Sequence, residues 1–379
     1  MYIIKIKNTY LNYFIYNNIL MNKNKQNLFN IFCKSIQMDN YNISNVNSIF
    51  KKVIKLSNKV KLSHDTFICN GKLYDFENKD TKANNSNEEN KNDSLLSNYI
   101  PPCLHFSIYS NQLLGRTYLN KRYTPIEFIN NNEFKLLIKV YKDLNSNIPI
   151  GKVAGYISQK VEENEIVNVT FPYGKFVYVG NGKFYHKNTN DNLVIKNINN
   201  WILKKHNSLG FIAAGTGITP IYRVINECFN REDSTNIKLI DMDKKERFPI
   251  HLIYVNYSDD ELYLKNELET FANLNSNYYK LKILFVITGK QQRLNENTVY
   301  KNYEKLFNNN ISYHYGSINK DILNNFFSST INNNLNNNIK SSFDSKESNF
   351  AIYSCGSKPF CNFFLKPLLE ESNYEHYFF

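Results

Sequence analysis

The chain has 379 residues, a formal net charge of +12 and a pI of about 9.1. This length suffices for two domains, each with its own core, and the many Leu, Ile, Val, Phe and Tyr residues exclude an intrinsically disordered protein. The lysines are scattered and no recognisable nucleic-acid module occurs, so we expect no nucleic-acid partner. The positive charge instead suits an anionic membrane face or an acidic protein.

The cysteines show no Cys-x-x-Cys pair and no metal-like spacing to histidine, which predicts reduced, mostly buried thiols and no metal site. They are Cys33, Cys69, Cys103, Cys228, Cys355 and Cys361. No run of 18 apolar residues occurs, so the pattern predicts no clear membrane-spanning helix.

Residues 1–45 contain the aromatic and aliphatic stretch TYLNYFIYNNILM with lysines around it. We expect this segment to be a leader, an anchor at a membrane surface, or disordered. The location therefore stays open between the cytoplasm and a membrane, either the endoplasmic reticulum or the mitochondrial outer membrane.

Residues 46–186 contain short apolar segments between polar turns, a pattern typical of a small antiparallel barrel. The polar stretch 72–98 is expected to be a disordered insertion. From residue 207 the pattern changes to strand followed by helix, as in FIAAG before ITPIYRVINECFN. Residues 207–379 are therefore predicted to form a doubly wound α/β domain with a parallel sheet.

The segment FIAAGTGITP (211–220) combines a strand, a turn of small residues and a helix start with proline in its first turn. The N–H groups of a helix start favour an anion. Two other strand ends, at 256–261 and 355–360, should face the same crevice, because ligands of such sheets lie beyond the carboxyl ends of the strands.

Several motifs, in this order, resemble the NADH:cytochrome b5 reductase family of the ferredoxin-NADP reductase superfamily. They are SHDTF (63–67), KRYTP (121–125), KLLIKVY (135–141), GKVAGYI (151–157), FPYG (171–174), AGTGITP (214–220), VNYSDDELYLKNELE (255–269) and CGSKPF (355–360). The resemblance implies an FAD-binding β-barrel domain over residues 46–186 and an NAD(H)-binding α/β domain over residues 207–379.

In the barrel, the resemblance places Tyr123 flat against the flavin and Thr124 near its redox-active nitrogen, with Lys121 and Pro125 in the same motif. The alternative for Tyr123 is simple packing in a strand. The family has Arg where this chain has Lys121, and Arg122 should point to the opposite face of the strand.

A backbone loop of the family that holds the flavin pyrophosphate corresponds to Gly151, Lys152, Val153 and Ala154; the alternative is an ordinary turn into a helix. Phe171 stands where the family has Gly, which predicts an altered turn.

Lys139 and Tyr141 share a face of one strand. The resemblance implies that Lys139 helps to hold the dinucleotide and that Tyr141 approaches the flavin. The alternative is a surface lysine beside a half-buried tyrosine.

In the second half, small residues would let the nicotinamide cofactor approach the backbone, with Thr216 directed toward the nicotinamide and the flavin. The implied contacts of this motif are Gly215, Thr216, Gly217, Thr219 and Pro220. Glu261 would bind the adenosine ribose and predicts NADH over NADPH, unless it is only a solvated acid at a helix start.

Cys355 would lie beside the nicotinamide, with Gly356 and Pro359, and would help to position the ring; the alternative is an inert buried thiol. The resemblance thus predicts a monomeric, FAD-containing enzyme with Thr124, Thr216 and Cys355 at the reacting centre. It would pass electrons from NADH to an acidic haem protein such as cytochrome b5. A related NADPH-dependent flavin reductase with another acceptor and a non-catalytic protein of the same fold are the alternatives.

Overall fold

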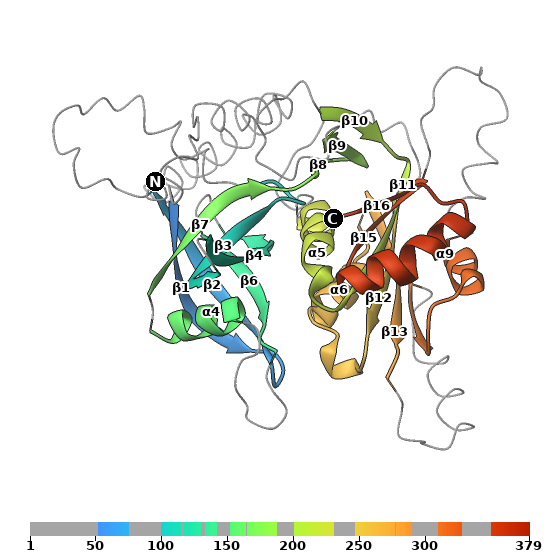
Figure 1. Ribbon diagram of the computed structural model, residues 1–379. Helices are drawn as coiled ribbons and strands as arrows, with labels where there is room; N and C mark the ends of the chain where they lie inside the picture. The colour runs from blue at the N-terminus through green and yellow to red at the C-terminus, as the bar shows by residue number, and fades with distance from the viewer. Residues whose placement is uncertain are drawn as a thin grey trace, which may run out of the picture.

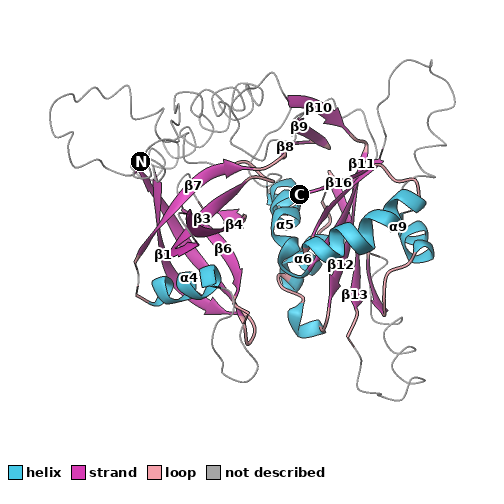
Figure 2. Cartoon of the chain, in the orientation of Figure 1, coloured by secondary structure: helices cyan, strands magenta, loops and turns pink. Residues whose placement is uncertain are grey.

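The computed structural model describes residues 52–75, 100–114, 117–129, 133–141, 152–163, 165–187, 201–230, 247–276, 278–289, 310–327 and 350–379. They form two halves connected by a small third sheet (Figure 1). Figure 2 shows that strands dominate one half, whereas strands and helices alternate in the other. The segment 1–45, predicted to be a leader, an anchor or disordered, lies outside the described residues.

The first half is an antiparallel, barrel-like sheet with strand order β4-β3-β7-β1-β2-β6-β5. Its strands are β1 (Lys52–Lys61), β2 (Thr66–Asp75), β3 (His105–Leu114), β4 (Thr117–Tyr123), β5 (Pro125–Phe128), β6 (Glu133–Lys139) and β7 (Ile166–Tyr173). At one end lies α4 (Lys152–Glu162), whose buried face consists of Val153, Ala154, Ile157 and Val161.

The sequence of β6 explains how the two halves meet. Phe134, Leu136 and Ile138 alternate along the strand and fill the interior of the barrel. Leu137 points the other way and packs into the apolar core of the second half. Because β6 is covered on both faces at this point, Leu136, Leu137 and Ile138 form a short apolar run within it.

The predicted insertion begins later than residue 72. Residues 72–75 complete β2 and pair with β1, and Lys72 Nζ lies 2.7 Å from a carboxylate oxygen of Glu133. This pairing overrides the polar composition that suggested disorder. Residues 76–98 lie outside the described residues.

The small sheet has the antiparallel order β10-β9-β8 and comprises β8 (Phe176–Gly180), β9 (Lys183–Lys187) and β10 (Trp201–Lys205). A two-residue turn, Asn181 and Gly182, connects β8 to β9, and both residues have positive φ (52° and 68°), as a type I′ hairpin requires. A Cβ at Gly182 would lie 2.2 Å from the carbonyl oxygen of His206, so only glycine fits there. We call these three strands the linker sheet.

The second half is the predicted α/β domain with a six-stranded parallel sheet of order β14-β13-β12-β11-β15-β16, and this prediction is confirmed. The strands are β11 (Ser208–Ala214), β12 (Phe248–Asn256), β13 (Tyr279–Ile287), β14 (Ile311–Tyr315), β15 (Phe350–Cys355) and β16 (His376–Phe378). The helices and helical turns are η4 (Gly215–Gly217), α5 (Ile218–Asn230), η5 (Asp259–Glu261), α6 (Lys265–Asn273), the π-helix η6 (Phe360–Leu365) and α9 (Lys366–Glu371).

The strand order turns at β11, which has β12 on one side and β15 on the other. In doubly wound sheets a crevice opens at such a switch point, outside the carboxyl ends of the strands. The residues that follow β11 and β15 are therefore placed together. Among the described residues, no helix is long and apolar enough to cross a membrane.

Apolar contacts join the barrel to α5. Cys103 and Ile126 of the barrel belong to the same buried cluster as α5, and the Arg223 guanidinium carbon lies 4.9 Å from the ring centre of Phe128. The halves therefore meet through a packed interface.

Candidate functional site

A cavity of about 720 Å³ lies between the two halves, within the size range of small-molecule sites. The barrel contributes side chains of β4 and β6 and the residues after them, and the second half contributes the carboxyl ends of its strands. The sequence-predicted residues that line this cavity are Lys121, Tyr123, Thr124, Lys139, Tyr141, Gly215, Thr216, Gly217, Thr219, Glu261, Cys355 and Gly356. The fold thus brings together residues that are up to 235 positions apart in sequence, from Lys121 to Gly356.

Tyr123 ends β4 with a buried ring, and its hydroxyl has no hydrogen-bond partner within the described part of the chain. Burial raises the pKa of this phenol, which stays protonated. Lys121 Nζ lies 5.9 Å from the ring centres of both Tyr123 and Tyr141, and burial lowers its pKa. An aromatic face, an unused hydroxyl and a nearby cation suit a planar ligand with polar edges and an anionic tail.

Arg122 was predicted to point away from Lys121, but both residues line the cavity. The Arg122 guanidinium carbon lies 5.5 Å from the ring centre of Tyr173 on β7. β4 is the edge strand of the barrel sheet, so no further strand blocks a long side chain on that edge. Lys121 Nζ instead lies near the rings of Tyr123 and Tyr141, so the two cations lie over different rings, and their opposite orientation stays a prediction.

Phe171 lies within β7, and the position in the left-handed region of this turn is Gly174, with φ of +146°. A Cβ at Gly174 would lie 2.6 Å from Leu104 Cδ2. The residue of this turn that must be glycine is therefore Gly174, which directly follows the strand, and Phe171 needs no glycine conformation.

The turn after β11 requires small residues for two reasons. Gly215 has a φ of +55°, and a Cβ at Gly217 would lie 2.3 Å from the carbonyl oxygen of Cys355. The turn is a short 3-10 helix, and α5 begins at Ile218, one residue before Thr219, rather than after Thr219. Thr219 Oγ1 donates a hydrogen bond of 3.2 Å to the carbonyl oxygen of Thr216, which stabilises this first turn.

Cys355 ends β15 and is partly exposed to the cavity. Burial, together with the neighbouring Cys361, raises the pKa of the thiol to about 12, so it remains protonated at neutral pH. A protonated thiol is a poor nucleophile. The chemistry of this residue therefore fits packing against a ligand rather than attack on it.

Lys139 forms an ion pair across the cavity. Its Nζ lies 2.9 Å from Glu261 of the second half and 3.4 Å from Asp65 of the barrel. Burial disfavours the charge of Lys139, but the hydrogen bond to Glu261 and the nearby Tyr263 and Asp65 outweigh it and raise the pKa. Glu261 was predicted to bind the adenosine ribose. In this structure Lys139 already compensates the charge of its carboxylate.

Other predicted residues lie outside this cavity. Pro125 and Pro220 pack beside it within β5 and α5, Pro359 precedes η6, and Gly151 is outside the described residues. Val153 and Ala154 are buried in the barrel core, so only their backbone is left to bind a ligand.

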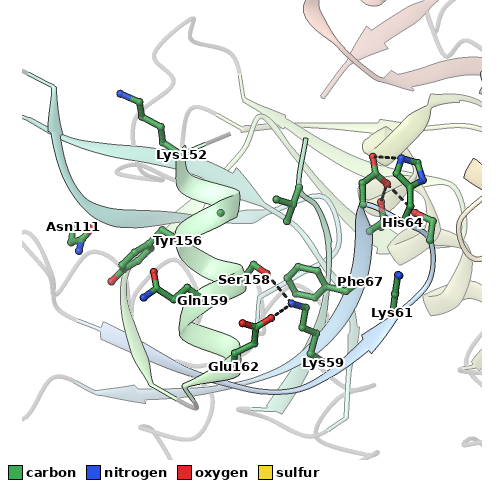
Figure 3. A pocket seen from close by; sticks show the side chains of 15 residues that line it. Lys59, Lys61, His64, Phe67, Asn111, Lys152, Tyr156, Ser158, Gln159 and Glu162 are labelled. Atoms are coloured by element: carbon green, nitrogen blue, oxygen red, sulfur yellow. Dashed lines mark hydrogen bonds and ion pairs between the residues drawn. The ribbon is translucent and has the colours of Figure 1, made fainter. Parts of the chain in front are cut away.

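Lys152 lines a second cavity of about 830 Å³ between α4 and the β1–β2 hairpin (Figure 3). There Lys59 Nζ bonds to Ser158 at 2.9 Å and to Glu162 at 2.5 Å, which ties the hairpin to the helix. The charges of Lys59 and Asp65 are thus already compensated by protein partners.

Sequence reasoning assigned no individual role to the rest of the wall of the first cavity, although Asn256, Tyr257, Ser357 and Phe360 lie in the two loops that were predicted to face it. The additional lining residues are Arg122, Leu137, Ala214, Val255, Asn256, Tyr257, Thr288, Ser317, Ile318, Ser357, Phe360 and Phe364. Phe360 and Phe364 stack with ring centres 5.7 Å apart on the π-helix, an irregularity that is frequent at functional sites. Their aromatic spacing after β15 was a signal, whereas nothing in the sequence marked Ser317 or Ile318. In the described ranges, no group of three His, Cys, Asp or Glu side chains is placed to hold a metal ion.

Comparisons with known proteins agree with this geometry. The model of the oxidoreductase NAD-binding domain family matches residues 211–320. NADH-cytochrome b5 reductase 3 of Rattus norvegicus is 29% identical over 180 residues, which is 46% of this chain and 52% of the rat protein. Inducible nitrate reductase [NADH] 2 of Glycine max is 27% identical over 169 residues, covering 44% of this chain and 16% of that protein.

The match thus spans about half the length of the cytochrome b5 reductase and a small part of the nitrate reductase. Among solved structures, the cytochrome b5 reductase domain of Ulva prolifera nitrate reductase shares the fold, with a TM-score of 0.55 and 19% identity over 86% of this chain and 96% of that domain. The predicted NAD-binding domain and two-domain fold are confirmed. The chain thus contains an oxidoreductase NAD-binding domain within a two-domain fold and is similar in sequence to NADH-cytochrome b5 reductases and nitrate reductases.

Proposed function

We propose that this chain is an FAD-containing oxidoreductase that transfers hydride from NADH to FAD and then passes single electrons to a haem protein such as cytochrome b5. The observation that carries this proposal is the shared cavity: the predicted flavin residues of the barrel and the predicted nicotinamide residues of the α/β half line one space. In this proposal residues 46–186 bind FAD and residues 207–379 bind NADH.

The barrel wall fits a flavin. Tyr123 offers a buried aromatic face and a hydroxyl without a protein partner in the described residues, and Lys121 supplies a cation for a phosphate. Thr124 lines the same wall and offers a hydroxyl to the ring edge. The flavin, when bound, supplies the conversion of a two-electron donor into single electrons.

The α/β wall fits a nicotinamide dinucleotide. The open space beside Gly215 lets a ligand reach the backbone, Gly217 lets the turn pack against Cys355, and the start of α5 favours the pyrophosphate. Cys355 keeps its proton and packs beside the nicotinamide, so its role is to orient the ring rather than to react. No residue acts as a general base, because hydride transfer moves no proton from a protein group.

The acceptor is inferred from the relatives and from charge. The similar proteins are named cytochrome b5 reductases and nitrate reductases. A net charge of +12 would steer an acidic haem protein toward this chain, with an association rate that falls as salt rises. A rate that is independent of ionic strength would contradict this partner.

One observation favours a second candidate, a reductase that also accepts NADPH. Lys139 compensates the charge of Glu261, so this carboxylate repels a 2′-phosphate less than a free one would. One relative, 29% identical over 181 residues, is named nitrate reductase [NADPH] in Phytophthora infestans. We expect NADH to remain preferred, and equal turnover with both dinucleotides would establish the second candidate.

The test is the absorbance spectrum of the purified full chain, before and after anaerobic addition of NADH. We expect the visible bands of an oxidised flavin, which NADH bleaches and a haem protein such as cytochrome b5 restores. A colourless protein that stays colourless after incubation with excess FAD would overturn the proposal and leave a non-catalytic scaffold of this fold.

A further inference from the structure

The mechanism leaves a buried polar network in the α/β half unused. Tyr353 on β15 is completely buried, and its hydroxyl lies 2.8 Å from Nε2 of His186 and 3.0 Å from Nε2 of His206. His186 belongs to β9 of the linker sheet, and His206 directly follows β10. We call this arrangement the His–Tyr–His clamp.

The clamp has a defined hydrogen-bond pattern. A phenol carries one proton, so Tyr353 donates to one imidazole and accepts an N–H from the other. The two Nε2 atoms therefore have opposite roles, one accepting from the phenol and the other donating to it. Burial, with a smaller contribution from His206, lowers the pKa of His186 to about 3, which keeps His186 neutral over the physiological pH range.

Aromatic rings hold the Tyr353 side chain on both sides. Phe184 of β9 stacks on it with ring centres 4.1 Å apart and an angle of 16°, and Tyr377 of β16 stacks at 5.1 Å and 29°. The hydroxyl and the ring are thus both fixed. Because polar groups in a buried site are costly to leave unpaired, the strand carrying Tyr353 has one favourable position against the linker sheet.

That position matters for the cavity, because Tyr353 precedes Cys355 by two residues on the same strand. Residues two apart in a strand share a face, and both side chains contact the apolar cluster that contains α5. β15 is flanked on its outer side only by the three-residue strand β16, whose pairing stops at Ser354. Cys355 therefore lies just past the end of the pairing that holds the outer edge of its strand.

The linker sheet also continues directly from the barrel, because only Gly174 and Lys175 separate β7 from β8. The clamp therefore ties the strand that carries Cys355 to a segment that continues from β7, whose Tyr173 ring lies 5.5 Å from the guanidinium carbon of Arg122 in the cavity wall. Hydride transfer depends on the distance between two rings, and a displacement of about 1 Å can cost about a hundredfold in rate.

We propose that Tyr353 is a positioning residue: its hydroxyl, held between His186 and His206, fixes β15 against the linker sheet and so sets where Cys355 lies in the cofactor cavity. This inference rests on the proposed function. It concerns a network outside the cavity lining, since His186, His206 and Tyr353 are absent from the residues that form the wall.

The test compares Tyr353→Phe with Tyr377→Phe in the flavin-loaded full chain. Both changes remove one hydroxyl from the same aromatic cluster, but the Tyr377 hydroxyl bonds only to Glu375 in the described contacts and takes no part in the clamp. We expect Tyr353→Phe to keep its flavin and its half-saturating NADH concentration, while flavin reduction at saturating NADH slows about tenfold or more. Tyr377→Phe should reduce its flavin at the wild-type rate.

A second measurement needs no cofactor. We expect N-ethylmaleimide to label Cys355 several-fold faster in Tyr353→Phe than in the wild type, as read by mass spectrometry, with the rate at Cys361 unchanged. A general loosening of the fold would accelerate both thiols. If wild-type protein binds no flavin, the proposed function fails, and the labelling comparison alone still decides whether Tyr353 fixes the thiol.

Should Tyr353→Phe fail to fold because two imidazoles lose their partner, the double variant Tyr353→Phe with His186→Leu removes one of those polar groups as well. It should show the same slow reduction and the same selective labelling. A wild-type reduction rate or a wild-type labelling rate at Cys355 in a folded variant would overturn the proposal, and so would equal effects in Tyr377→Phe.

Discussion

The barrel half and the α/β half build their walls of the cavity from different parts of the polypeptide. In the barrel, side chains on β4 and β6, such as Lys121, Tyr123 and Lys139, supply the ring face and the charge. In the α/β half, the backbone at the strand ends forms the wall. The backbone can take this course because Gly215 and Gly217 have no side chain. Where side chains form the wall, each substitution changes its shape or charge. Where backbone forms the wall, a substitution is tolerated only if there is room for a Cβ atom.

This difference explains where the chain departs from the family pattern. The barrel motif has Lys121 in place of Arg, but Arg122, the next residue, also lines the cavity and supplies a guanidinium group there. In contrast, the AGTGITP turn is retained, because Gly217 contacts the carbonyl of Cys355 directly. At Lys121, therefore, a neighbouring cation is available to compensate, whereas no such compensation is available at Gly217.

Acid should produce the largest effect, since it acts on both halves. Burial lowers the pKa to about 3 for His105 in the barrel, His186 in the linker sheet and His251 in the α/β half. Unfolded histidine titrates near 6.5, so the unfolded state binds more protons between pH 6.5 and 3. Stability should therefore fall as pH drops through this window, by about 1.4 kcal/mol per pH unit for each histidine.

Urea unfolding at pH 7 and pH 5 measures this loss. His105→Gln and His251→Gln should each reduce the loss of unfolding free energy between pH 7 and pH 5. The half in which the substitution causes the larger reduction is the half that acid destabilises more. His64→Gln, at a side chain that is 79% exposed, is the matched control for the substitution itself. An equal slope in all variants would contradict the assignment to buried histidines.

Gly217→Ala should have the next largest effect, because it disturbs the close packing of the turn after β11 against the end of β15. The new Cβ would lie 2.3 Å from the Cys355 carbonyl and would push β15 away from the turn. We expect NADH-dependent flavin reduction to fall by about a hundredfold while flavin content is retained. Stopped-flow reduction measures the rate, and absorbance measures the content.

The matched control is Gly215→Ala, two residues earlier. No atom lies within 4 Å of a Cβ there, so the change costs only the strain of a φ of +55°, about 1 kcal/mol. A loss of activity as large as that of Gly217→Ala would show that ligand approach or backbone conformation at Gly215, rather than contact with Cys355, limits this wall.

Tyr123→Leu tests the wall of side chains. The change removes the aromatic face but keeps an apolar group, so we expect flavin affinity to fall about tenfold while the dinucleotide half stays intact. Tyr123→Phe keeps the ring and should lose less. Fluorescence titration of the apoprotein with FAD measures both, and equal affinity in the wild type and Tyr123→Leu would contradict a flavin on this face.

The sequence predicted those parts of the site that local chemistry controls. The AGTGITP turn requires small residues for its own conformation, and the resemblance located Tyr123, Thr124 and Cys355, all of which line the cavity. Parallel β-α units were visible because strand and helix periods alternate. The Asn181-Gly182 turn was an unused signal for the hairpin of the linker sheet.

What could not be predicted depends on contacts between distant segments. Lys139 and Glu261 are 122 positions apart, and nothing in either motif indicates that the two charges compensate each other. The His–Tyr–His clamp combines His186 of β9, His206 after β10 and Tyr353 of β15 in the same way. Both features arise only when segments far apart in sequence are placed together.

The smallest effect is expected at the second cavity, which is larger than the first but built differently (Figure 3). Lys59 already bonds to Ser158 and Glu162 there, and the Glu162 side chain is 65% exposed, so the ion pair is weak. Lys59→Met should therefore cost about 1 kcal/mol or less by urea unfolding and leave flavin content and NADH oxidation unchanged. Lys61→Met, on the same hairpin, serves as the control. If Lys59→Met alone released the flavin, this cavity would take part in cofactor binding, and the side-chain wall of the barrel would extend beyond the seam between the halves.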